Sequence, residues 1–377
     1  MSVGQAARRA ATKSSGPRYL CGDDPPARGT GPVRQLRVAA WAARRPGAAA
    51  AVQQRGRRVT RTFIPQPILD AAHARAAARA ARDWAIADRL REDIEAAGWR
   101  VVDTGTDFSL ERAHPPDLEL GGIVRYGRSS AVPSRLDEPA TGLATVILVA
   151  GEDVDDLARA TRSILDHAPK EVGLVIVADD AGSPMTEHLN GLPDDIEVVR
   201  TSERLGTGAA WNIGLRRATA EVVAFIDPGI ELKGDAITPL ARALDDPAVA
   251  IAGPFGLHSG DLRRFDETTV AGPAAAIEGY LMAFRRADAA ARMPIDEAFR
   301  FYRNLDIWWS FELRDVGPDA PPRKAMVVPG LPLVRHEHRG WTALEPAERE
   351  RLSKRNFYRL LDRFRDRDDL AVEGEAG

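Results

Sequence analysis

Cysteine and long apolar runs are nearly absent from this chain of 377 residues. Cys21 is the only cysteine, which excludes a disulfide framework and a zinc cluster built from cysteines, and is typical of a reducing compartment. No uninterrupted apolar run approaches the roughly 20 residues that span a bilayer, and no short apolar signal segment follows the first methionine. These absences predict a cytoplasmic protein.

The net charge of −3 combines two oppositely charged parts. Residues 1–60 hold twelve Arg or Lys and two Asp, a net charge of +10, so the remaining 317 residues sum to −13. The basic part has too few large apolar side chains to offset the entropy of ordering, and we expect a disordered arm at 1–60. A solvated tail, a tether to an anionic surface and a targeting segment all fit its composition. The acidic remainder argues against nucleic acid as a general partner.

Residues 61–112 predict a small helical module. From Pro67 to Ala97, apolar side chains recur at steps of three and four residues, which is typical of one amphipathic helix. Gly98 is typical of a helix stop, and residues 99–102 predict a short strand after it. A helix of this kind needs a packing partner for stability.

This module also resembles part of a known family. The run Arg79–Glu92, followed by Gly98 and the segment Val102–Thr104, is similar to the C-terminal helical piece of cysteinyl-tRNA synthetases. The catalytic signatures and zinc-binding cysteines of that family have no counterpart in this sequence, so aminoacylation is excluded. A packing or oligomerisation module is one interpretation, and a contact surface for RNA or a protein partner is the other.

The rest of the chain predicts a larger α/β domain. Residues 113–140 are expected to be a linker because prolines and glycines recur there. Short apolar, β-branched runs then alternate with stretches of helical spacing, which is typical of a mostly parallel sheet with helices on both faces. We place this domain at 141–341. Residues 342–377 predict an amphipathic helix and a tail, with packing on the domain and peripheral membrane contact as alternatives.

Acidic or glycine-rich groups follow four of the predicted strands. Glu152 follows the first strand, Asp179 and Asp180 follow the second, Gly206 follows the third and Asp227 follows the fourth. In open α/β sheets, ligands bind beyond the carboxyl ends of the strands. We therefore expect these groups to gather at one ligand-binding edge.

The same residues in the same order resemble the family 2 glycosyltransferases, which are inverting enzymes with the GT-A fold. The resemblance covers most of residues 143–341 and also includes Leu205–Gly214, Asp296–Phe299, Asp306 and His336. It implies a nucleotide-diphosphate sugar as donor and a hydroxyl group as acceptor. It leaves the base, the sugar and the acceptor molecule open.

For the donor, the resemblance assigns nucleotide-sugar binding to Glu152, Asp179, Asp180, Gly206 and Asn212. Carboxylates suit this work because they accept hydrogen bonds from the imide of uracil and from ribose hydroxyls. Glycine permits close approach of the backbone to the ligand. A turn-forming role for Asp180 and a helix-entry role for the glycine loop are the alternatives.

For a metal, the resemblance assigns a divalent cation, Mn²⁺ or Mg²⁺, to Asp227, which matches the first aspartate of the DxD element of the family. Gly229 stands where that element has its second acidic residue. His336 matches a histidine of the family and could add a ligand. The segment 278–280 lies where the family contacts the donor sugar.

For the acceptor, the resemblance assigns the catalytic base to Asp306. The family has an acidic run at this place, and in Arg303–Asp306 only the last residue keeps a carboxylate. Helix capping is the alternative role for it. Asp296 and Glu297 match positions that orient substrate, and Trp308 could stack on a sugar or lie in the core.

Two other functions remain open at this point. The departures at Gly229 and Asn304 are compatible with a catalytically degenerate protein that still binds nucleotide sugars or regulates another protein. An RNA-associated module is the third alternative, and it rests on the basic arm and the synthetase-like segment.

Overall fold

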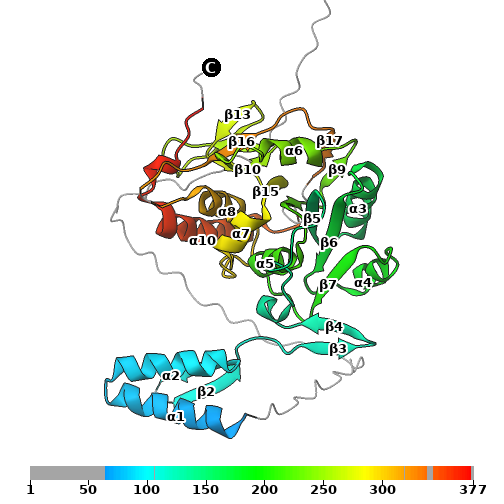
Figure 1. The fold of residues 1–377 in the computed structure, drawn as a ribbon. Coiled ribbons are helices and arrows are strands. Elements are labelled where there is room, and N and C mark those ends of the chain that lie inside the picture. The colour runs from blue at the N-terminus through cyan, green and yellow to red at the C-terminus, as the bar shows by residue number, and fades with distance from the viewer. Residues whose placement is uncertain (1–63, 106, 318, 338–342, 375–377) are drawn as a thin grey trace, which may run out of the picture. The chain divides into compact units, whose positions relative to one another are not determined.

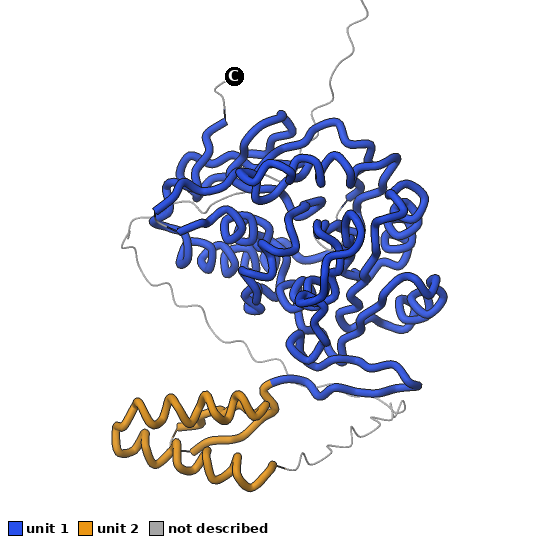
Figure 2. The backbone as a smooth tube through the Cα atoms, viewed as in Figure 1, with its two compact units in different colours: residues 1–21, 114–377 blue, residues 22–113 orange. Residues whose placement is uncertain are grey.

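The computed structural model describes residues 64–105, 107–317, 319–337 and 343–374, and the predicted basic arm at 1–60 lies outside them. The chain divides into two compact units, whose described parts are residues 64–113 and those from His114 onward (Figure 2). Within the described ranges, no helix has both the length and the hydropathy needed to cross a bilayer.

The first unit is two helices packed against a β-hairpin. Its elements are α1 (Gln66–Ala80), α2 (Trp84–Ala96), β1 (Trp99–Thr104) and β2 (Asp107–Arg112). The two strands pair antiparallel, and Ala72, Ile94 and Trp99 form the buried core. The strand predicted at 99–102 is confirmed.

The prediction of one long helix from Pro67 to Ala97 is wrong. The helix breaks between α1 and α2, where Arg82 takes a left-handed conformation with φ of 60°. The Asp83 carboxylate then accepts a hydrogen bond from the Ile86 N–H at 3.2 Å, which caps the start of α2. The break lets α1 and α2 lie side by side, so each helix supplies the packing partner that the other needs.

The second unit is built on a ten-stranded mixed sheet (Figure 1). The strand order is β13 (Gly272–Ala274), β16 (Lys324–Val327), β10 (Val249–Gly253), β15 (Leu281–Arg285), β8 (Val222–Ile226), β5 (Ala144–Val149), β6 (Val172–Ala178), β7 (Glu197–Thr201), β4 (Ile123–Tyr126) and β3 (Leu118–Leu120). The central strands β8, β5, β6, β7 and β4 are parallel, and β15 enters antiparallel between β8 and β10.

Two small sheets flank the large one. The strands β12 (Asp266–Thr268), β11 (Gly256–His258) and β14 (Ala276–Ile277) form the first. The strands β17 (Leu333–Arg335) and β9 (Ile230–Leu232) form the second. The second sheet matters for the site because it ties the segment before His336 to the loop after β8.

Helices cover both faces of the large sheet. The helices α3 (Val154–His167), α4 (Ser183–Asn190) and α6 (Ile237–Ala243) share one buried cluster. The helices α5 (Thr207–Arg217), α7 (Arg286–Arg292), α8 (Leu305–Arg314) and α10 (Pro346–Phe364) share the other. Along β5, Val146 and Leu148 face the first cluster while Ile147 faces the second, which explains the continuous apolar run. The predicted α/β fold is confirmed.

The segment before the large domain differs from its prediction, whereas the helix after the domain agrees with one of its two predicted roles. The segment 113–140, expected as a linker, instead contributes β3, β4 and the short helix η1 (Ser129–Ala131), and β4 pairs with β7. Helix α10 packs on the body through Leu360 and Phe364, as one of the two alternatives predicted. A second short helix, η2 (Asp368–Leu370), follows it.

Candidate active site

A cavity of about 1690 Å³ opens where β5, β6 and β8 end. Its walls come from the loops after these strands, from the start of α8 and from the segment after β17. The predicted site residues that line it are Glu152, Asp179, Gly206, Asp227, Asp306 and His336. The parallel strands thus bring residues far apart in the sequence to one edge.

Asp179 shapes the loop that precedes α5. Its carboxylate accepts hydrogen bonds from the N–H groups of Leu205 (2.7 Å) and Gly206 (2.8 Å) and from the Thr201 hydroxyl (3.1 Å). Burial raises the pKa of Asp179, and these hydrogen bonds oppose the rise. The carboxylate therefore fixes the loop beside the cavity.

Glycine is required where this loop meets the segment before α8. Gly206 has φ of 99°, and a Cβ there would lie 2.7 Å from Cα of Arg300. The Gly208 N–H donates to the Phe299 carbonyl at 2.8 Å. The loop thus forms one continuous wall with residues 299–300.

Glu152 and Asp180 are both exposed, but only Glu152 lines the cavity. Glu152 lines the cavity and forms an ion pair with Arg204 at 3.0 Å. Asp180 has φ of 60°, its N–H donates to the Thr201 hydroxyl at 2.9 Å, and its side chain is not among those that line the cavity. This geometry agrees with the turn-forming alternative for Asp180.

Neither Asn212 nor Glu297 lines the cavity. The Asn212 amide donates to the Ile295 carbonyl (2.9 Å) and to Glu297 Oε1 (3.0 Å), and its oxygen accepts from the Ile295 N–H (2.8 Å). Glu297 also accepts from the Ser129 hydroxyl. With only 1% of Asn212 exposed, these contacts join α5 to residues 295–297 and leave it no surface for a nucleotide. The predicted nucleotide contact at Asn212 is replaced by this structural link.

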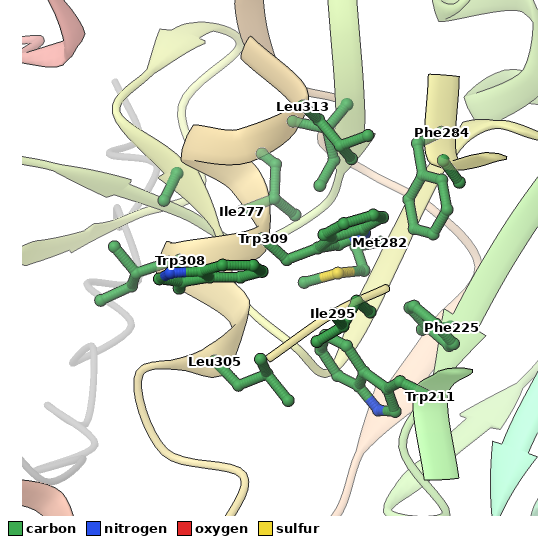
Figure 3. Close-up of a cluster of buried hydrophobic side chains, with 14 of the residues drawn as sticks. Trp211, Phe225, Ile277, Met282, Phe284, Ile295, Leu305, Trp308, Trp309 and Leu313 are labelled. Atoms are coloured by element: carbon green, nitrogen blue, oxygen red, sulfur yellow. The ribbon is translucent and has the colours of Figure 1, made fainter. Parts of the chain in front are cut away.

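Asp296 and Trp308 also lie outside the cavity lining. The Asp296 carboxylate accepts from the Ala298 N–H at 2.9 Å and lies 3.7 Å from Arg359 of α10. Trp308 lies in the hydrophobic cluster of Figure 3, stacked against Trp309 with ring centroids 6.4 Å apart. Of the two alternatives for Trp308, the structure gives the core.

Asp227 lies in the loop after β8. His336 directly follows β17 and contacts that loop. Asp227 Oδ1 accepts from the Gly229 N–H at 2.7 Å, and a Cβ on Gly229 would lie 2.8 Å from that oxygen. The His336 N–H donates to the Gly229 carbonyl at 2.8 Å, and its Nε2 lies 2.9 Å from Glu231 Oε2. Within the described part of the chain, no group of three or more His, Cys, Asp or Glu side chains is arranged around one point.

The chemistry of these two side chains suits a cation that is also bound by the phosphates of a substrate. Mg²⁺ and Mn²⁺ favour oxygen ligands and are commonly bound by one or two carboxylates together with substrate phosphates. A carboxylate on the outer nitrogen of a histidine orients its ring, as Glu231 does for His336. Asp227 thus has the donor chemistry that a divalent cation favours, and Nδ1 of His336 is the ring nitrogen that is not directed at Glu231.

Asp306 lies in the first turn of α8 and lines the cavity. Its Oδ2 accepts from the Gly279 N–H and its Oδ1 from the Ile307 N–H, both at 3.0 Å. Burial raises the pKa of Asp306, while these backbone hydrogen bonds lower it. The carboxylate is thus oriented by the main chain and lies on the cavity surface.

Glu278 is a second carboxyl group on this surface. Only 2% of the residue is exposed, and its Oε2 lies 3.8 Å from the Arg335 guanidinium, which stacks on the Tyr280 ring at 3.7 Å from the centroid. Burial raises the pKa of Glu278 to about 8, although Arg335 opposes the rise. The group is therefore largely protonated at neutral pH and can donate a hydrogen bond.

The pairing of Glu278 with Arg335 was missed by the sequence analysis. The family resemblance marks 278–280 only as a sugar contact, and it assigns no role to Arg335. The available signal was a glutamate between apolar residues, since Ile277 and Leu281 are strand-like and a carboxyl among them implies a specific role.

Part of the chain is similar in sequence to known glycosyltransferases. Residues 145–300 match the family model described as Glycosyl transferase family 2. The human protein named Probable polypeptide N-acetylgalactosaminyltransferase 8 is 29% identical over 177 residues, which cover 44% of this chain and 26% of that protein. The mouse protein named Polypeptide N-acetylgalactosaminyltransferase 15 is 31% identical over 185 residues, which cover 46% of this chain and 28% of that protein.

A solved structure described as GalNAc-T7 with UDP, GalNAc and Mn²⁺ is also similar, with a TM-score of 0.48 and 17% identity over 62% of this chain and 49% of that one. The chain spans about a quarter of the length of the curated relatives named above. The sequence matches support a glycosyltransferase domain at residues 145–300.

Proposed function

We propose that this protein transfers a sugar from a nucleotide-diphosphate sugar to a hydroxyl acceptor, with inversion at the anomeric carbon. The observation that carries the proposal is the cavity at the strand ends, where Asp179 and Asp227, both within the region that matches glycosyl transferase family 2, line one cavity with Asp306. In this proposal Asp179 positions the donor-binding loop, Asp227 holds a cation and Asp306 acts as the base, and these are the three functions that such a transfer needs.

The donor end of the cavity is formed by the loop that Asp179 holds. In this proposal Glu152 and the backbone around Gly206 contact the nucleoside, and Asp179 positions that backbone rather than contacting the base. Arg204, which pairs with Glu152, supplies a positive charge beside the same wall. Glu152 exchanges this exposed ion pair for ligand contacts with little loss, because exposed ion pairs contribute little.

The diphosphate lies toward Asp227 and His336 in this proposal. A divalent cation held there would neutralise the charge that builds on the leaving diphosphate. The chain holds Asp227 in place through the Gly229 N–H, and Glu231 orients His336, so both side chains are positioned before the donor arrives. The cavity walls carry more acidic than basic side chains, so a bound cation would strengthen the binding of an anionic donor.

The chemical step places the acceptor hydroxyl against Asp306. The acceptor oxygen forms a bond to the anomeric carbon, the bond from that carbon to the diphosphate oxygen breaks with its electron pair, and the hydroxyl proton passes to the Asp306 carboxylate. Burial raises the pKa of Asp306, which makes it a stronger base than an exposed aspartate. Glu278, still protonated near neutral pH, donates a hydrogen bond to a substrate oxygen at the same end.

A turnover assay tests this proposal. The full chain is incubated with UDP-, GDP- and dTDP-sugars, with and without Mn²⁺, and release of nucleoside diphosphate is measured. We expect Asp306→Asn to lower turnover by about 10²-fold or more while donor affinity is kept. Asp245→Asn, an exposed aspartate outside the cavity lining, is the matched control and should leave turnover unchanged.

A nucleotide-sugar-binding protein without catalysis is the second candidate. The single carboxylate at the metal loop favours it, because Gly229 provides no second acidic ligand. Binding of a nucleotide sugar with neither transfer nor donor hydrolysis would select this candidate. Equal turnover in Asp306→Asn and the unmutated chain would remove the proposed base.

A further inference from the structure

Two arginines lie side by side on the sheet, apart from the cavity. Arg125 of β4 and Arg200 of β7 are direct partners in the parallel pairing of these strands, so both side chains leave the same face of the sheet. That face also carries Ala178 of β6, and α4 packs against it (Figure 1). Neither arginine lines the cavity of the proposed active site.

These guanidinium groups have few partners. Arg200 is 9% exposed, and its Nη2 donates to Asn190 Oδ1 at 2.9 Å. The Nε atoms of Arg125 and Arg200 are both buried without a hydrogen-bond partner. Among the described residues, neither arginine forms an ion pair. The side chain of Arg125 forms no hydrogen bond with any of these residues. The Ser202 hydroxyl, two residues beyond Arg200, is likewise buried without a partner.

Burying a cation beside a like charge is unfavourable without a compensating anion. Burial lowers the pKa of Arg200, and the neighbouring Arg125 lowers it further, while no carboxylate opposes either effect. Arginine still remains charged at neutral pH, so the positive charge persists. The usual solution in folded proteins is a paired carboxylate, and the described neighbours do not provide one.

We propose that Arg125 and Arg200 bind the phosphate group of a small anionic ligand at a site separate from the donor cavity. Two guanidinium groups offer donors in the fork geometry that phosphate oxygens accept, and the amide of Asn190 fixes one of them. The Ser202 hydroxyl, directly after β7 and two residues from Arg200, is a further buried donor. Free phosphate and a phosphomonoester share this chemistry.

Calorimetric titration of the full chain tests this site. Inorganic phosphate is the first probe and glycerol 3-phosphate the second, both at constant ionic strength set with chloride. We expect saturable binding that weakens by about tenfold or more in Arg125→Gln and in Arg200→Gln, because each change removes a charged hydrogen-bond donor. Tighter binding of glycerol 3-phosphate than of phosphate would identify a phosphomonoester as the ligand, and the reverse order would identify free phosphate.

Two controls separate this site from the donor cavity and from folding. Arg162→Gln changes an exposed arginine of α3 and should leave phosphate binding unchanged. Asp227→Ala alters the donor cavity and should also leave it unchanged, so failure of the proposed function does not affect this test. Because Arg200→Gln alters a buried position, Arg125→Gln, which is partly exposed, carries the test if the other variant fails to fold. Phosphate binding that is unaffected in Arg125→Gln, or lost in Asp227→Ala, would overturn the proposal.

Discussion

Glu278 should make the stability of this protein fall as the pH rises. Burial raises the pKa of Glu278 from 4.5 to about 8, so the folded state holds a proton that the unfolded chain has already released over that interval. Stability from this group is complete below the unfolded pKa and is lost as the pH rises toward the folded pKa. From about pH 5 to about pH 9 the expected loss is about 4 kcal/mol, at 1.36 kcal/mol for each pKa unit.

Glu278→Gln removes this dependence because glutamine does not titrate. Urea denaturation of the variant and of the unmutated chain, measured across that pH range, gives the difference in unfolding free energy at each pH. We expect this difference to shift in favour of the variant by up to about 4 kcal/mol as the pH rises, and contributions from groups that do not interact with Glu278 cancel in the comparison.

An exposed glutamate provides the control for this measurement. Glu187 lies on the surface of α4, and Glu187→Gln should follow the unmutated chain at every pH. Identical pH dependence in Glu278→Gln and the unmutated chain would refute the reasoning, because it would mean that the buried carboxyl ionises at its ordinary pKa in the folded protein.

Other substitutions test the neighbouring contacts. Arg335→Met removes the charge that lowers the pKa of Glu278, so the pH at which stability is lost should move upward; denaturation at several pH values detects this shift, and a downward shift would contradict it. Asn212→Ala leaves the buried N–H and carbonyl of Ile295 without their Asn212 partners and should lower the unfolding free energy by about 3 kcal/mol, measured by urea denaturation. Donor affinity should stay unchanged in the variants of Asn212 that remain folded, and a selective loss of affinity would restore its predicted nucleotide contact.

The strands of the parallel sheet could be predicted because burial on both faces leaves a simple pattern. Val146, Ile147 and Leu148 of β5 each face a hydrophobic cluster, so the run is continuously apolar and short. The edge of the sheet gave no such signal. Leu118 and Leu120 of β3 are exposed, and prolines and glycines surround that segment, so a linker was the natural prediction.

The helix break in the first unit could not be predicted from periodicity. The apolar spacing continues across Arg82, which adopts a left-handed conformation that arginine rarely takes. Asp83 was the available signal, because a helix cap is a common role for aspartate. The likeness of this unit to cysteinyl-tRNA synthetases stays a prediction.

In the candidate site, too, some residues could be placed from the sequence and others could not. Strand-end residues such as Glu152 and Asp227 reach the cavity because the topology of a parallel sheet fixes where strand ends lie. Polar residues inside helices are harder to place, since Asn212 could satisfy its amide with a nucleotide or with the backbone of Ile295, and spacing alone does not distinguish the two. Residues on separate segments, such as Glu278 and Arg335, meet only in the folded chain.

Calorimetric titration of nucleotide sugars into the full chain tests the central claim most directly. We expect a UDP-, GDP- or dTDP-sugar to bind at millimolar concentration or below, and we expect Asp227→Ala to abolish the part of this binding that depends on Mn²⁺. Absence of binding by every one of these donors, with Mn²⁺ present, would contradict the account.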